Sequence, residues 1–217
     1  MFIGHYAVAF AAKKAAPKVS LGWLVAAANF IDYVFPVLLL AGVEHARIVP
    51  GFTAAVPLDF YDYPWSHSLL MTAVYGALLG GVYYARKKER GAALLLFGVT
   101  VSHWLLDVAS HGPDMQIAPG VETRLGLGLW NSIPATMAVE IPLFLAGVWL
   151  YLSTLHRRSR RAKFGIPIFV SFLFAVYIAN LFAPPPPSVT AIGIVGLLPL
   201  LFIPLCHWLD TDPRLSS

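Results

Sequence analysis

Long apolar segments separated by short polar connections constrain this chain more than any other feature. Six such segments run over residues 21–43, 68–85, 92–111, 133–155, 166–183 and 189–208. Each is close to the length of about 20 residues that crosses a hydrocarbon core about 30 Å thick. The chain of 217 residues is 58% hydrophobic and only 12% charged, whereas soluble domains carry about 25% charged residues. The sequence therefore predicts an all-α, polytopic transmembrane helix bundle of about six spans, forming a single integral membrane domain over residues 1–217.

A shorter apolar segment opens the chain. Residues 2–12 are too few to cross a bilayer. They predict a short N-terminal apolar helix that dips into the membrane or lies along its surface. Lys13 and Lys14 follow this segment and no basic residue precedes it, which is unlike a cleavable signal peptide.

The basic residues gather in three connections, at residues 13–18, 86–90 and 157–163. The alternate connections, which include residues 49–65 and 112–130, contain more acidic residues than basic ones. By the positive-inside rule the basic connections face the cytoplasm. This predicts a multi-pass protein of the cell membrane, the inner membrane in a bacterium, with both termini cytoplasmic. No basic stripe carries interleaved aromatic residues, so we expect membrane lipid and no nucleic acid as a partner.

Ionisable side chains lie within the apolar segments or at their edges. A charged group in a membrane span is costly and marks a functional site by default. The residues concerned are His5, Asp32, His67, His103, Asp107, His111 and Glu140. Imidazole and carboxylate groups together are typical ligands of a transition metal ion.

The third span carries the strongest local pattern. His103, Asp107 and His111 are spaced four residues apart, so on a helix successive members stay within about 40° of one face and rise about 6 Å per step. The pattern predicts three metal ligands that face one neighbouring helix, or two ligands with Asp107 orienting an imidazole. The alternative is a polar stripe that joins helices by hydrogen bonds.

His67 stands at the start of the second span. Ser66 or Ser68 can cap this helix, which places His67 at its N-terminus. The position suits a metal ligand. It equally suits an interfacial helix cap next to Trp65 as a residue of the aromatic belt.

Asp32 lies in the middle of the first span, three residues after Asn29. Pro36 follows four residues later, so we expect the helix to be kinked or interrupted near Asp32. Such a break would make room for an ion. A protonated aspartate, or one paired with another helix, is the alternative.

Four motifs, in their order along the chain, resemble those of the LexA-regulated, membrane-bound metal-dependent hydrolase family. They are Gly4-His5 near the start, Asp32 ahead of a proline, Ser66-His67-Ser68 at a helix start, and His103-x-x-x-Asp107 on a helix. The match extends from the N-terminal segment to about His111. That family is in turn distantly similar to the fold of zinc-dependent phospholipase C and P1 nuclease, in which helices carry His and Asp ligands for zinc.

The resemblance implies zinc ligation by His5, Asp32, His67, His103, Asp107 and His111. Glu140 would stand near the late acidic ligand of the nuclease fold. From the sequence alone Glu140 fits a metal ligand, a general base or a partner of Arg124, and in a hydrolase Asp32 or Glu140 would accept the proton. The first family motif usually holds two carboxylates, where this chain has only Asp32, and Thr136 stands where the nuclease fold has a histidine. We therefore expect one or two metal ions and not three.

Three functions fit the sequence. The first is a metal-dependent hydrolase that acts on a phosphoester or lipid-like substrate at the membrane. The second is a proton or metal-ion transporter that uses the intramembrane His, Asp and Glu residues. The third is a non-catalytic structural membrane protein whose polar residues hold helices together. Metal content separates the first two from the third, and transport compared with turnover separates the first from the second.

Overall fold

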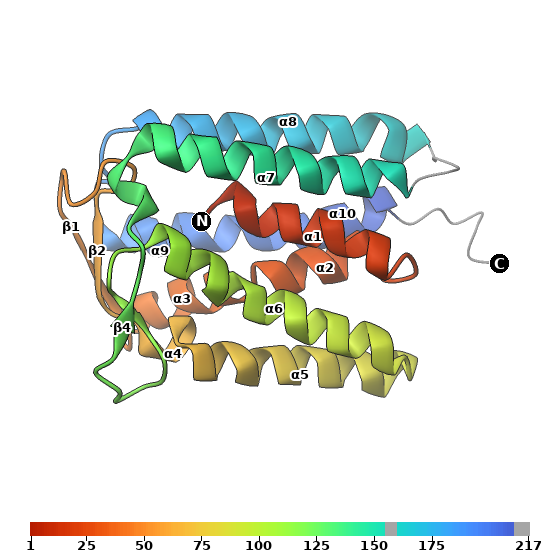
Figure 1. Cartoon of the computed structure of the whole chain (residues 1–217), viewed down its shortest axis with the longest axis horizontal. Coiled ribbons are helices and arrows are strands. Elements are labelled where there is room, and N and C mark those ends of the chain that lie inside the picture. The colour runs from red at the N-terminus through yellow and green to blue at the C-terminus, as the bar shows by residue number, and fades with distance from the viewer. Residues whose placement is uncertain (155–159, 211–217) are drawn as a thin grey trace.

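The computed structural model describes residues 1–154 and 160–210 as a bundle of helices with two short hairpins at one end (Figure 1). The helices are α1 (Ile3–Ala15), α2 (Leu21–Ala28), α3 (Phe30–Leu40), α4 (Pro64–His67), α5 (Leu69–Lys87), α6 (Arg90–Ser110), α7 (Ile133–Ser153), α8 (Arg160–Phe182), α9 (Val189–Leu197) and α10 (Phe202–Asp210), with single 3-10 turns η1 (Leu129–Asn131) and η2 (Leu198–Leu201). Strands β1 (His45–Ile48) and β2 (Leu58–Asp62) pair antiparallel, as do β3 (Met115–Gln116) and β4 (Arg124–Leu125). The predicted helical bundle is confirmed, and the two hairpins are additions that the sequence did not predict.

Four helices of the described residues are long and apolar enough to cross a membrane. They are Arg90–Ser110, Ile133–Ser153, Arg161–Phe182 and the continuous stretch Val189–Asp210. Large apolar side chains such as Leu94, Trp149 and Ile168 are exposed on their outer faces, as expected of surfaces that face lipid. A fifth span results if α2 and α3 count as one. The predicted number of six is not established, because α5 carries glycines and tyrosines that make it less apolar than the four.

The first predicted span is broken. α2 and α3 meet at Asn29 and are bent by 52°. The sequence predicts a kink near Asp32, caused by Pro36. The break lies instead at Asn29, almost one turn earlier. The side-chain amide of Asn29 donates to the carbonyl of Val25 at 3.1 Å, and a side chain that bonds the preceding turn in this way often bends a helix.

The N-terminal helix α1 lies inside the bundle, between α7 and α6 in the view of Figure 1. Nine of its residues, from Ile3 to Lys13, are buried, so the prediction that this segment lies along the membrane surface is wrong. The C-terminal end of α1 is held by Lys13, whose Nζ lies 2.5 Å from Asp210 Oδ2 and 2.8 Å from the Val19 carbonyl. The reason is packing: α1 buries its apolar side chains against other helices and not against lipid.

Two glycines let α5 pack tightly on α6. A Cβ atom at Gly76 would lie 3.1 Å from the Phe97 carbonyl oxygen, and one at Gly80 would lie 2.6 Å from the Ala93 carbonyl oxygen. The four-residue spacing puts both glycines on one face, as in close helix pairs of membrane proteins. The close contact places α6, which carries His103 and Asp107, firmly in the bundle.

The two ends of the bundle differ. Figure 1 shows β1, β2 and β4 at one end, and the α1–α2 and α5–α6 turns at the other. These turns hold two of the three basic connections, at residues 13–18 and 86–90. The third, residues 157–163, lies in part outside the described residues. The alternation of basic and acidic connections along the sequence thus corresponds to two ends of the molecule.

Candidate metal centre

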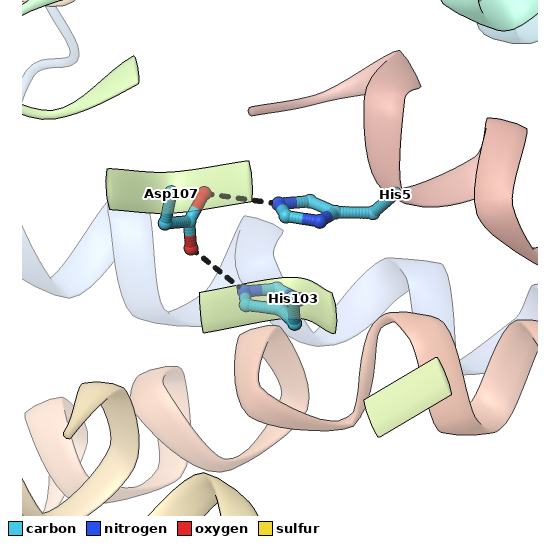
Figure 2. Close-up of side chains that lie close together, drawn as sticks. All are labelled: His5, His103 and Asp107. Atoms are coloured by element: carbon cyan, nitrogen blue, oxygen red, sulfur yellow. Dashed lines mark hydrogen bonds and ion pairs between the residues drawn. The ribbon is translucent and has the colours of Figure 1, made fainter. Parts of the chain in front are cut away.

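Asp107 lies beside two stacked imidazole rings and directs one carboxylate oxygen at each of them (Figure 2). Its Oδ2 lies 2.9 Å from His103 Nε2, one turn earlier on α6, and its Oδ1 lies 3.1 Å from His5 Nε2 on α1. The two rings are nearly parallel, at 4°, with centroids 3.7 Å apart. The backbone nitrogen of Met1 also contacts Oδ1 of Asp107. His103 and Asp107 lie one turn apart on α6, as the sequence predicts, and His5 on α1 is the third member of this group.

Asp32 and His67 form a second group with the same His103. The Oδ1 atom of Asp32 lies 3.6 Å from His67 Nε2 and 3.6 Å from His103 Nε2. His67 Nε2 also lies 3.9 Å from Asp107 Oδ2. Within each group of three, the ligand atoms lie within 4.8 Å of one another. Side chains from α1, α3, α4 and α6 therefore meet at one place, as a shared cation would require.

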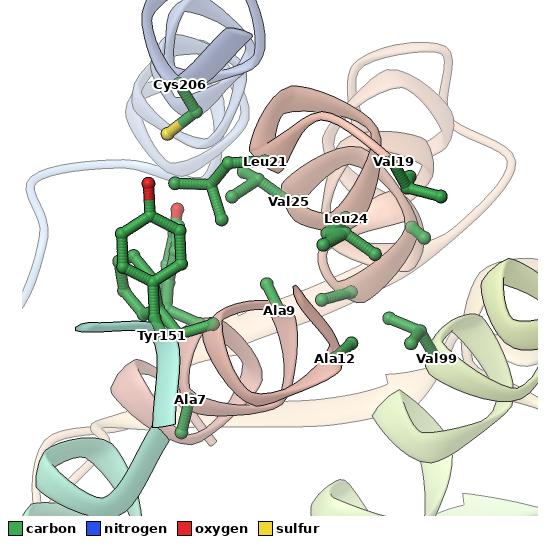
Figure 3. Close-up of a cluster of buried hydrophobic side chains, with 14 of the residues drawn as sticks. Ala7, Ala9, Ala12, Val19, Leu21, Leu24, Val25, Val99, Tyr151 and Cys206 are labelled. Atoms are coloured by element: carbon green, nitrogen blue, oxygen red, sulfur yellow. The ribbon is translucent and has the colours of Figure 1, made fainter. Parts of the chain in front are cut away.

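Hydrophobic packing fixes the helix that brings His5 to this place. Figure 3 shows side chains of α1 against those of neighbouring helices. The labelled members are Ala7, Ala9 and Ala12 of α1, Val19, Leu21, Leu24 and Val25 of the α2 region, Val99 of α6, Tyr151 of α7 and Cys206 of α10. The small alanines on α1 allow close approach, so the position of His5 depends on a well-packed core.

His103 is prepared as a ligand by its own hydrogen bond. Its Nδ1 lies 2.8 Å from the carbonyl oxygen of Ala28 at the end of α2. A carbonyl only accepts, so Nδ1 carries a hydrogen, and in the neutral ring Nε2 is the nitrogen with the free lone pair. That buried Nε2 has no hydrogen-bond partner within residues 1–154 and 160–210, although two carboxylates face it. This nitrogen and the carboxylates that face it could hold a metal ion.

His103 belongs to both groups, which limits how ions can bind. Only Nε2 of His103 is directed at the carboxylates, and one lone pair holds one ion. Asp107 has two oxygens, one toward His5 and the other toward His103 and His67. The donors could therefore hold one ion or two.

Asp32 is the accessible member of the site. The side chain of Asp32 is 45% exposed, whereas that of Asp107 is 2% exposed and that of His67 is 7% exposed. A molecule the size of water can therefore reach the Asp32 carboxylate. Asp107 and its imidazole partners are closed off by protein.

His111 lies outside both groups. α6 ends at Ser110, and His111 has an extended backbone with φ −69° and ψ 157°, so the predicted helical stripe covers two residues and not three. Its Nδ1 lies 3.2 Å from both Tyr63 Oη and Asp114 Oδ1. Burial and the Asp114 carboxylate hold the pKa of Tyr63 well above its ordinary value. The phenol therefore stays protonated and donates to Asp114 at 2.8 Å.

Glu140 also lies outside both groups and contacts the start of α1. Its Oε2 accepts hydrogen bonds from the backbone nitrogens of Phe2, at 2.9 Å, and Gly4, at 3.2 Å. The first N–H groups of a helix have no intrahelical acceptor, and Glu140 supplies one within the buried bundle. In this position it supports the helix that carries His5.

Glu44 contacts the site, although no sequence pattern predicts this. It follows α3 and is 1% exposed. Its Oε2 accepts from Ser66 Oγ at 2.6 Å, and Ser66 Oγ lies 2.7 Å from His67 Nδ1. The serine hydroxyl is buried and already donates to a carboxylate, so it is not placed as a nucleophile. The predicted helix cap is Ser68, which accepts from Met71 N at 3.3 Å.

No protein-family model, curated protein or solved structure matches this chain. The functional conclusion rests therefore on the donor set itself. That set contains three imidazoles and two carboxylates, from His5, His67, His103, Asp32 and Asp107.

Proposed function

We propose that the chain is a metal-dependent hydrolase of the cell membrane that holds one or two divalent ions, zinc by its donor set, and cleaves a phosphoester or lipid-like substrate. One observation carries the proposal: the Nε2 atoms of His67 and His103 converge on Asp32 and Asp107 in a site assembled from separate helices. The resemblance to the LexA-regulated hydrolases implies the same chemistry and, apart from His111, the same metal ligands.

The residues have separate roles in this proposal. His5, His67, His103 and Asp107 hold and orient the ion, and their burial excludes other water. When bound, zinc polarises a phosphoryl or acyl oxygen and acidifies water. The accessible carboxylate of Asp32 is within reach of an attacking water and accepts its proton. Glu140 is assigned to the start of α1, where it keeps His5 in place.

The proposed membrane placement follows the charge pattern. Six spans result when the bent pair α2–α3 and the less apolar α5 are counted with the four long apolar helices. The end with the basic turns and the end of α10 face the cytoplasm, and the hairpins face outward. Asp107 lies in the last turn of α6 and His67 in α4, both toward the hairpin end. The substrate would thus be a phosphoester lipid or related molecule in the outer half of the membrane.

Metal content and turnover test the proposal together. Protein purified without chelator should contain about one or two zinc ions per chain by elemental analysis, and it should hydrolyse a phosphoester lipid in mixed micelles. Asp32→Asn should keep the fold and lose hydrolysis by about 100-fold or more, as expected for a positioned general base. Wild-type protein free of metal after supplementation with zinc would end the proposal.

A transporter of metal ions or protons is the second candidate, and the bend between α2 and α3 favours it. Broken helices at a charged intramembrane site are typical of transporters, and here the break lies three residues from Asp32. Zinc flux or proton flux into proteoliposomes, lost in Asp32→Asn, together with no phosphoester turnover, would select this function over hydrolysis.

A further inference from the structure

Glu44 is a buried carboxylate without a cation. None of the ion pairs among the described residues includes it, and its side chain is 1% exposed. Ser66 instead donates a hydrogen bond to each of its oxygens. Oε1 accepts from the backbone nitrogen of Ser66 at 2.7 Å, and Oε2 accepts from the Ser66 hydroxyl at 2.6 Å. Burying an acidic group costs stability unless it is hydrogen-bonded, and these bonds offset that cost.

The bond from Ser66 to Glu44 decides what Ser66 can do for His67. A hydroxyl has one hydrogen, and the carboxylate takes it. Ser66 Oγ can then only accept from His67 Nδ1, which lies 2.7 Å away. Nδ1 therefore carries the hydrogen, and Nε2 directs its lone pair toward Asp32, 3.6 Å away.

We propose that Glu44 is a positioning residue that, through the Ser66 hydroxyl, holds His67 in the tautomer able to bind a metal ion. The inference rests on the proposed metal centre and assigns it a residue outside the ligand set. The two histidines differ in this respect. The backbone carbonyl of Ala28 fixes the tautomer of His103. The tautomer of His67 is fixed by two side chains in series, those of Ser66 and Glu44.

Substitution Glu44→Gln separates this role from a merely structural one. Glutamine has the same shape, but one of its two terminal groups is an NH2 donor. Its oxygen must face the Ser66 backbone N–H, so its NH2 faces Ser66 Oγ. The hydroxyl hydrogen then turns to His67 Nδ1, and the ring must carry its own hydrogen on Nε2. The variant keeps every hydrogen bond and removes the ligand lone pair.

Zinc affinity in detergent solution, measured by competition with a fluorescent chelator, tests the consequence. Glu44→Gln should weaken zinc binding by about 10- to 100-fold, the usual effect of losing a group that orients a ligating histidine. Ser66→Ala, which removes the link, should also weaken it. Glu122→Gln, at an exposed acidic residue of the loop after α6, should bind zinc as the wild type does.

Nitrogen NMR of metal-free protein with labelled histidine supplies a readout that needs no zinc. The His67 signal, identified by its loss in His67→Gln, should report hydrogen on Nδ1 in the wild type and on Nε2 in Glu44→Gln. Unchanged zinc affinity and an unchanged tautomer in Glu44→Gln, with normal wild-type binding, would overturn this inference alone. A wild-type protein that binds no zinc would overturn the metal centre and this inference with it.

Discussion

Replacement of Glu140 should distinguish a support of α1 from a catalytic group. Its Oε2 accepts hydrogen bonds from the Phe2 and Gly4 backbone nitrogens at 2.9 and 3.2 Å. Glu140→Ala leaves the buried Gly4 donor and the part-buried Phe2 donor without this acceptor. At about 1–3 kcal/mol for a buried donor and less for the other, we expect a loss of about 2–4 kcal/mol. Glu140→Gln keeps an oxygen for both bonds and loses only the interaction of a charge with the helix start, about 0.3–1 kcal/mol.

Thermal unfolding in detergent micelles is the assay. With about 2–4 °C per kcal/mol for a chain of this length, the alanine variant should melt on the order of 10 °C below the wild type, and the glutamine variant within a few degrees of it. Glu122→Ala, at an exposed loop residue, serves as the control. Equal melting of the two Glu140 variants would refute the support role. A glutamine variant that melts normally but loses hydrolysis would instead establish Glu140 as the catalytic base that the sequence suggests.

Two further substitutions probe the site and the bundle. His103→Ala removes the imidazole shared by both groups, so elemental analysis should find much less metal than in the wild type. His45→Ala, at a half-exposed histidine of β1, should retain full metal, and equal metal in both variants would contradict the shared-ligand arrangement. Gly80→Ala forces a Cβ atom to within 2.6 Å of the Ala93 carbonyl oxygen and should cost about 1–3 kcal/mol of stability by overpacking. Gly81→Ala is the control, because a Cβ atom there meets nothing within 4 Å. Both variants gain the same helix propensity, so equal melting temperatures would refute the close α5–α6 contact.

Local chemistry made much of the fold and part of the site predictable. Apolar segment length located the long helices, and the spacing of His103 and Asp107 placed both on one face of α6, because helix geometry depends on neighbouring residues only. The same reasoning wrongly predicted that His111 continues this helical face. Gly112 and Pro113 follow it, and the helix ends at Ser110 before the third turn of the pattern is reached.

Contacts between residues far apart in the chain were not predictable in this way. Glu44 meets Ser66 across 22 positions, and Glu140 meets Gly4 across 136. Neither acidic residue lies in a sequence pattern from which its partner could be predicted. The interior position of α1 depends likewise on the surfaces of α7, α2 and α6, so a short apolar segment fitted a surface location as well as a buried one.

The break at Asn29 joins the membrane fold to the proposed chemistry. In an uninterrupted helix the carbonyl of Ala28 would pair with the N–H of Asp32, four residues on. The bend of 52° takes that carbonyl out of the helical pattern, and it accepts a hydrogen bond from His103 Nδ1 instead. The same bend starts a new helix just before Asp32 and brings its carboxylate to within 3.6 Å of His103 Nε2. One irregularity thus sets the tautomer of the shared imidazole and delivers the accessible carboxylate, so a straight first span would disable both.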